Sequence, residues 1–297
     1  MFKEPYVLCF FSCYLLAFLF ELTSLRARNV ELMRKISRQL LTIGIIVHSV
    51  VLFKHGVLQN ARFFSSGKDW FFALAFAAAL STFVLSVVYK KTPFNFFFLP
   101  LILLVLILSD FAWNATFSQE ATCRFVRMSH AVSLLLATLC SFIGAIIGTM
   151  FFIQRKRLKN KMFHSRISLP SLEWLGYGVR HSANVSILFL GIGVTTGFSL
   201  NLLAPKDESG TFIWRDPVVL GATLLFVLSL LALAHKLWFN NTDVNAKDAA
   251  FSLIECAVLV ILLLFATFSY SHWQGLNSNR YDSKEDLSNV SLVETLR

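Results

Sequence analysis

A series of long apolar segments limits the fold of this chain more than any other sequence feature. An α-helix needs about 20 residues to cross the hydrocarbon core of a bilayer, and the apolar segments have roughly that length. No alternating strand-like pattern is present, which argues against a membrane β-barrel. With 56% hydrophobic and 15% charged residues, the chain is also too apolar for an ordinary soluble domain.

We therefore predict an all-α integral membrane protein, built as a bundle of eight transmembrane helices. The predicted spans are 6–25, 39–53, 70–89, 94–113, 128–152, 184–203, 218–237 and 249–270. They make residues 1–270 one membrane domain, and the polar residues 271–297 are predicted to form a tail outside the membrane. An even number of spans places both termini on the same side.

The basic residues predict which side that is. The loops after the first, third, fifth and seventh spans, with the adjoining helix ends, hold 16 of the 27 Lys and Arg residues. Basic loops are retained in the cytoplasm, so both termini are predicted to be extracytoplasmic and the protein to lie in the cytoplasmic (inner) membrane. The basic run 155–161 is interpreted first as a topology signal and second as a contact for anionic lipid or a partner. It is not interleaved with aromatic residues, so nucleic acid is not expected as a partner.

Small residues indicate where helices approach closely. Gly144 and Gly148 form a GxxxG pair in the fifth span, and three glycines lie in the sixth span at positions 191, 193 and 197. Residues 169–175 are predicted to form a short interfacial helix that Ser171 caps.

The sequence gives little sign of covalent chemistry. Four of the five cysteines lie in apolar runs, and no Cys-x-x-Cys pair is present. No nucleophile with a neighbouring base and no nucleotide-binding loop is placed to act, so an enzyme is not expected.

Histidines and one glutamate are the polar groups of interest within or beside the spans. His48 lies deep in the second span, where haem ligation and a hydrogen bond to a neighbouring helix are equally compatible with its burial. His130 and His272 are predicted at the outer boundary, on the same face as the loop 210–217. Glu255, in the last span, is interpreted as paired with Lys236 or Lys247 or as protonated, with a proton relay as the alternative.

An ordered set of motifs resembles the cytochrome c assembly proteins of the CcsA and HemX type, and the HemX-like branch most closely, with residues 128–270 as the matching core. The motifs are His130 on a helix with a basic exit, the glycine-rich end 191–197 of the sixth span, Gly210 six residues before Asp216-Pro217, and Leu233-Ala-His235-Lys236.

This resemblance implies a membrane protein of cytochrome c biogenesis that binds or presents haem at the outer face. It implies His130 and His272 as ligands of the haem iron, and His48, Trp214 and Asp216 as further haem-binding residues. The implied partners are apocytochrome c and other maturation proteins of the membrane. The loop departs from the family pattern because Trp214 is its single tryptophan and Val219 replaces a glutamate. An accessory or regulatory membrane protein of haem biosynthesis that binds no haem therefore stays open as the alternative.

Overall fold

The computed structural model describes residues 5–27, 29–54, 67–90, 92–111, 124–161, 168–203, 217–238, 246–262 and 265. Within these residues the regular elements are helices and no strand is present. They are α1 (Pro5–Ser24), α2 (Val30–Phe53), α3 (Gly67–Val88), α4 (Phe94–Phe111), α5 (Arg124–Lys159), α6 (Leu172–Leu203), α7 (Pro217–Trp238) and a further helix at 246–262.

The apolar segments form helices of the length that a membrane requires. Five of the described helices are long and apolar enough to cross a bilayer, and two shorter apolar helices lie in α4 and α7. The five are Tyr6–Ser24, Val30–Phe53, Lys68–Val88, Met128–Lys159 and Leu172–Leu200. The prediction of a multi-pass helical membrane protein is thus confirmed in outline, whereas the eight spans and the side of the termini stay predictions.

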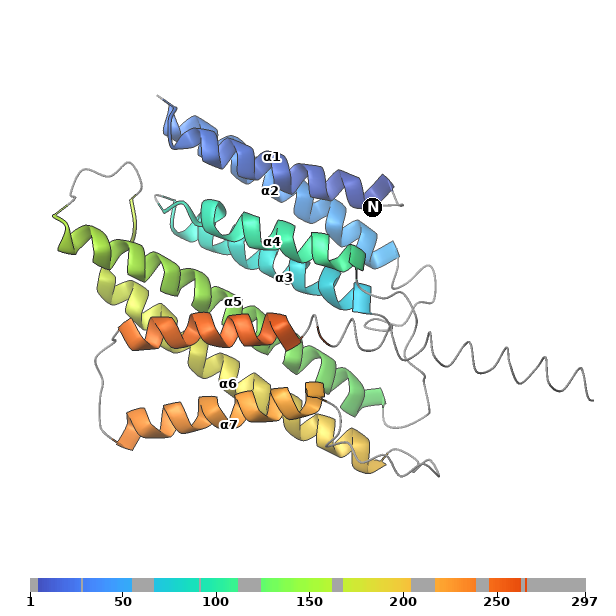
Figure 1. Cartoon of the computed structure of the whole chain (residues 1–297). Coiled ribbons are helices and arrows are strands. Elements are labelled where there is room, and N and C mark those ends of the chain that lie inside the picture. The colour runs from blue at the N-terminus through green and yellow to red at the C-terminus, as the bar shows by residue number, and fades with distance from the viewer. Residues whose placement is uncertain are drawn as a thin grey trace, which may run out of the picture.

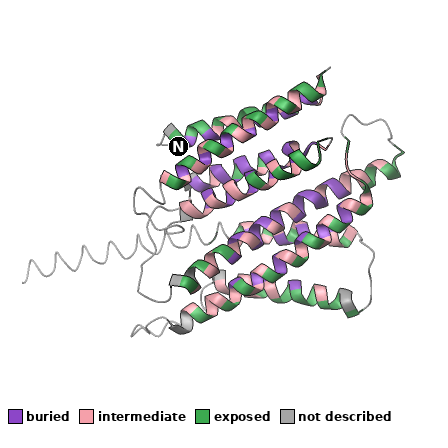
Figure 2. Cartoon of the chain, turned by 180° about the vertical axis from the view of Figure 1, so that it is seen from behind, coloured by how far each residue is buried: buried purple, intermediate pink, exposed green. Residues whose placement is uncertain are grey.

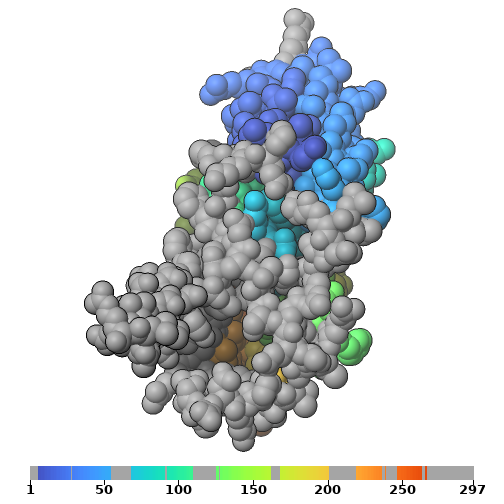
Figure 3. All heavy atoms as spheres, turned by 90° about the vertical axis from the view of Figure 1, so that its right-hand side faces the viewer, coloured from blue at the N-terminus to red at the C-terminus, as the bar shows by residue number. Residues whose placement is uncertain are grey.

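The helices run alternately up and down and fall into two groups (Figure 1). In the first group, α1 contacts α2, α2 contacts α3, α3 contacts α4, and α4 closes the ring on α1. In the second group, α5 and α6 share the most extensive contact of the structure, and α7 packs on α6. Helix α3 contacts α5 and so joins the groups. In the space-filling view, α1 and α2, in blue, lie together at the top of the molecule (Figure 3).

Apolar side chains line both the inside and the outside of this bundle. Buried residues lie where the helices face one another, while exposed residues cover the outward faces (Figure 2). Many of the exposed residues are large and apolar, for example Leu19, Ile46 and Val84. Apolar side chains on outward faces are unfavourable in water but suit a surface in contact with lipid.

The GxxxG pair of α5 lies at two close helix contacts, as the sequence predicted. A Cβ atom on Gly144 would lie 2.7 Å from Ser182 Oγ of α6. A Cβ atom on Gly148 would lie 3.1 Å from the carbonyl oxygen of Ala249, in helix 246–262. The two glycines therefore allow α5 to approach both neighbours at once.

Two helices begin earlier than hydropathy predicts. Helix α2 begins at Val30, nine residues before the predicted span 39–53, because the basic residues of its first turns are good helix formers although they are too polar for lipid. The prediction of a separate interfacial helix at 169–175 is wrong, because the residues from Leu172 onward form the first turns of α6. The predicted cap is present: Ser171 Oγ accepts a hydrogen bond from the backbone N–H of Trp174 at 3.3 Å.

The close contact at Gly148 yields a test of the fold. We expect Gly148→Leu to lower the free energy of unfolding by about 1–3 kcal/mol, because the new side chain meets backbone atoms of 246–262 that cannot move aside independently. Gly148→Ala should cost less. Thermal unfolding in detergent, followed by circular dichroism, measures the effect. The control is Val132→Leu on the exposed face of α5, and equal losses in the control and in Gly148→Leu would contradict the proposed packing.

Candidate functional site

His48 lies inside the α1–α4 group and is enclosed by aromatic side chains. It is 1% exposed. Its ring stacks on Phe10 of α1, with centroids 4.2 Å apart and planes 2° apart. The rings of Phe72 and Phe76 in α3 meet it nearly at right angles. The imidazole is thus held by packing on its face and on its edges.

A hydrogen bond between two helices fixes the orientation of this imidazole. Tyr14 Oη of α1 lies 3.2 Å from His48 Nδ1. Gly44, one turn before His48, makes room for the tyrosine, since a Cβ atom there would lie 2.6 Å from Tyr14 Cε1. The hydrogen-bonded alternative for His48 is therefore observed. A haem macrocycle would have to displace the surrounding aromatic rings to reach His48, so these residues do not fit that group as they are packed.

His130 lies in the second helix group, near the beginning of α5, and is only half-buried. Its Nδ1 atom lies 2.8 Å from the carbonyl oxygen of Gly193 in α6. A carbonyl oxygen only accepts hydrogen bonds, so Nδ1 carries the proton and donates it. The neutral ring then has its lone pair on Nε2, which is the tautomer that a histidine needs to bind a metal through Nε2.

Glycines of α6 determine how closely this ring can lie against the helix. A Cβ atom on Gly197 would lie 2.9 Å from His130 Cε1, and one on Gly193 would lie 2.5 Å from Leu134 Cδ2. Larger residues at either position would push α5 away from α6 or turn the imidazole. The glycines that the sequence indicated as packing residues thus also position His130.

Only some residues of the predicted site, His48 and His130 among them, belong to the part of the chain that the structure describes. His272, Trp214 and Asp216 lie outside the described residues, as does most of the loop 210–217. The neighbours of His48 named above belong to α1–α3, whereas the hydrogen-bond partner of His130 belongs to α6. The two histidines therefore belong to different helix groups.

A buried carboxyl group with hydroxyl neighbours is a feature that sequence reasoning mostly missed. Glu255 is 1% exposed, and its Oε1 atom lies 2.7 Å from Ser186 Oγ in α6. Ser141 and Ser252 are also buried, and neither hydroxyl has a hydrogen-bond partner within the described part of the chain. The missed signal is the spacing of the serines: 182 and 186 lie one turn apart on α6, and 252 lies three residues before Glu255.

The number of protons available for hydrogen bonds around Ser186 favours an uncharged Glu255. Ser186 Oγ lies 2.7 Å from Glu255 Oε1 and also 3.1 Å from the carbonyl oxygen of Ala137, yet a hydroxyl has only one proton to donate. Both contacts are satisfied when the acid donates to Ser186 and Ser186 donates to Ala137. No ion pair to Glu255 is present among the described residues, so the predicted pairing with Lys247 is not observed.

No protein-family model matches the chain, and no curated protein or solved structure matches it.

The Tyr14–His48 hydrogen bond predicts that substitutions of these two residues have strongly coupled effects on the free energy of unfolding. We expect Tyr14→Phe to lower the free energy of unfolding by about 1–3 kcal/mol, because it leaves a buried imidazole nitrogen without its partner. His48→Leu should be costly as well. The double variant should lose less than the sum of the single losses, since both polar groups are then absent. A double-mutant cycle from thermal unfolding in detergent measures this, and strict additivity would show that the contact is energetically irrelevant.

Glu255 offers a test of its charge state. We expect Glu255→Gln to change the free energy of unfolding by less than about 1 kcal/mol, because an amide donates to Ser186 as an uncharged acid does. Glu255→Ala should cost about 2 kcal/mol or more through the cavity and the lost hydrogen bond. If the glutamine variant were as unstable as the alanine variant, an ionised and paired carboxylate would be the better description.

Proposed function

We propose that this protein binds haem at the outer face of the membrane, with His130 as an axial ligand of the iron, and that it serves cytochrome c biogenesis. The observation that carries this proposal is the hydrogen bond from His130 Nδ1 to the carbonyl oxygen of Gly193, at 2.8 Å. It supports a ring with a fixed orientation and an unprotonated Nε2. Histidines that ligate metals commonly donate their other N–H to such an oxygen, which also raises the basicity of the ligating nitrogen.

The position of His130 also supports this role. It lies near the beginning of the long helix α5, toward the end opposite the basic residues 155–161, which the positive-inside rule assigns to the cytoplasm. It is half-buried, so the imidazole is held firmly yet open enough to meet a ligand. Haem would supply an iron that accepts the lone pair of an imidazole such as that of His130.

Other parts of the proposed site come from the sequence. His272 is proposed as the second ligand, and Trp214 and Asp216 as contacts of the macrocycle in the loop 210–217. This placement requires eight spans with both termini outside the cytoplasm. In this proposal His48 contributes to the rigidity of the α1–α4 group through Tyr14, which departs from the haem-binding role that the resemblance implied.

An absorption spectrum tests the proposal. The purified protein, titrated with haem in detergent, should develop a Soret band. His130→Ala should weaken haem binding by more than the roughly 10- to 100-fold that removal of a ligand's hydrogen-bonding partner costs. Gly197→Val should also weaken binding, because a Cβ atom there would press on the imidazole.

The matched control is His181→Ala. This histidine is exposed, stacks on Tyr177 and lies near the beginning of α6, far along that helix from Gly193. It should leave the spectrum unchanged. A Soret band that is equally strong in wild type and His130→Ala would reject His130 as a ligand.

The second candidate function is an accessory or regulatory membrane protein of haem biosynthesis that binds no haem. The observation that favours it is the end of α5, where Arg155, Lys156 and Lys159 are all exposed and available to a cytoplasmic partner. Two results together would favour this function over the first. The wild-type protein would show no haem-dependent absorption, and neutralising these three charges would abolish the protein's effect on haem biosynthesis in cells.

A further inference from the structure

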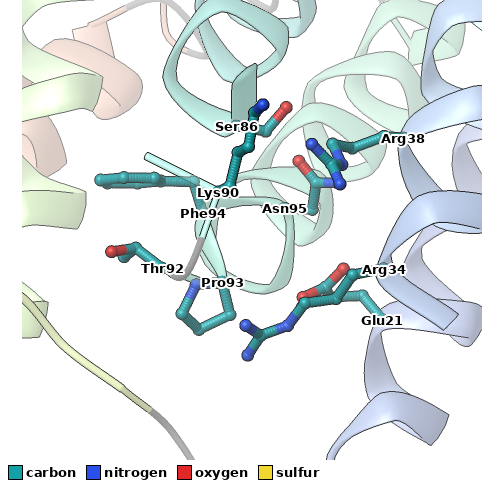
Figure 4. A pocket seen from close by; sticks show the side chains of 9 residues that line it. All are labelled: Glu21, Arg34, Arg38, Ser86, Lys90, Thr92, Pro93, Phe94 and Asn95. Atoms are coloured by element: carbon teal, nitrogen blue, oxygen red, sulfur yellow. The ribbon is translucent and has the colours of Figure 1, made fainter. Parts of the chain in front are cut away.

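A polar pocket lies among helix ends at the basic side of the α1–α4 group (Figure 4). Side chains from the end of α1, the beginning of α2 and the α3–α4 connection line it. Its enclosed cavity volume is only about 10 Å³, room for about one water molecule, so a larger group would have to bind at its open mouth. Its basic residues contribute to the predicted topology, but the haem proposal makes no use of the pocket.

The pocket has a surplus of positive charge. Arg34, Arg38 and Lys90 line it together with a single carboxylate, Glu21, which gives a net charge of +2. Glu21 is 1% exposed, and its Oε1 atom lies 3.5 Å from Arg34 Nε, so these two residues form an ion pair. Within the described part of the chain, Arg38 and Lys90 make no ion pair. The surplus therefore resides on Arg38 and Lys90.

The floor of the pocket is built by contacts between helices. Asn95 Nδ2 of α4 donates to Ser37 Oγ of α2 at 3.1 Å, and Ser37 Oγ donates to the carbonyl oxygen of Ala17 in α1 at 2.9 Å. Arg38 follows Ser37 directly, so this chain of hydrogen bonds fixes the turn of α2 from which Arg38 extends. Figure 4 shows the guanidinium group of Arg38, from α2, beside Asn95, and the side chain of Lys90, from the α3–α4 connection, extending toward Ser86.

We propose that this pocket binds a phosphate group at the cytoplasmic surface of the membrane. A guanidinium group and an ammonium group that line one narrow opening suit a single tetrahedral anion better than a large ligand, and Arg presents paired N–H donors that match phosphate oxygens. Basic pockets between membrane helices on the cytoplasmic side bind anionic lipid head groups by the same chemistry. The phosphate can belong to such a head group or be free in solution.

The test compares these two sources in the full-length protein. The delipidated protein is titrated in detergent with phosphatidylglycerol, with phosphatidylcholine or with inorganic phosphate, and bound ligand is measured by native mass spectrometry. Selective binding of phosphatidylglycerol identifies a lipid head group, whereas saturable binding of inorganic phosphate identifies a free anion. We expect Arg38→Gln/Lys90→Gln to weaken binding roughly 25-fold, at about 1 kcal/mol per charge.

The control variant, Lys247→Gln, removes one exposed charge that does not line the pocket and should leave binding unchanged, in contrast to Lys90→Gln. Arg38→Lys/Lys90→Arg keeps the charge and should retain binding. If Arg38→Gln/Lys90→Gln does not fold, Lys90→Gln alone, at an exposed position, should weaken binding about fivefold. Equal losses in the pocket and control variants, or no loss in the pocket variant, would overturn the proposal.

Discussion

Polar side chains within the apolar helices must find their partners inside the protein, because the hydrocarbon core offers no water to satisfy them. The structure meets this requirement across helix boundaries. Tyr14 joins α1 to His48 of α2, His130 of α5 joins Gly193 of α6, and Ser186 of α6 meets Glu255 of the last helix. These contacts have direction as well as strength, so they fix how each helix is rotated. Apolar packing alone, which is similar against protein and against lipid, specifies that rotation less well.

Close approach of the backbones makes these hydrogen bonds possible. Gly44 makes room for Tyr14, Gly197 lies against His130, and Gly144 lies against Ser182. In each case a methyl group at the glycine would collide with a side chain of the neighbouring helix. The small residues and the buried polar residues therefore depend on one another, and a change in one is expected to disturb the other.

The sequence predicted the helical membrane fold because the length of an apolar segment is a direct physical requirement of the bilayer. It predicted the beginnings of α2 and α6 poorly, because hydropathy ends where the polar interface begins while the helix continues through it. For the candidate site, the sequence indicated His48 and His130 as unusual. It could not identify Tyr14 or Gly193 as their partners, since these lie 34 and 63 residues away along the chain. Pairing between residues so far apart in the sequence depends on how the helices are rotated and aligned, and a local sequence pattern carries no information about this.

The unbroken course of α6 has a mechanical consequence. The helix has 32 residues, and Trp174 in its first turn bonds through its indole N–H to the hydroxyl of Tyr89 at 3.3 Å. Gly193, which accepts the hydrogen bond from His130, lies on the same rod about 28 Å farther along at 1.5 Å per residue. Because the rod is stiff, a small tilt about its middle moves these two contacts in opposite directions. A tilt of α6 would therefore change the Trp174 contact and the His130 contact together, although they lie near opposite ends of the helix.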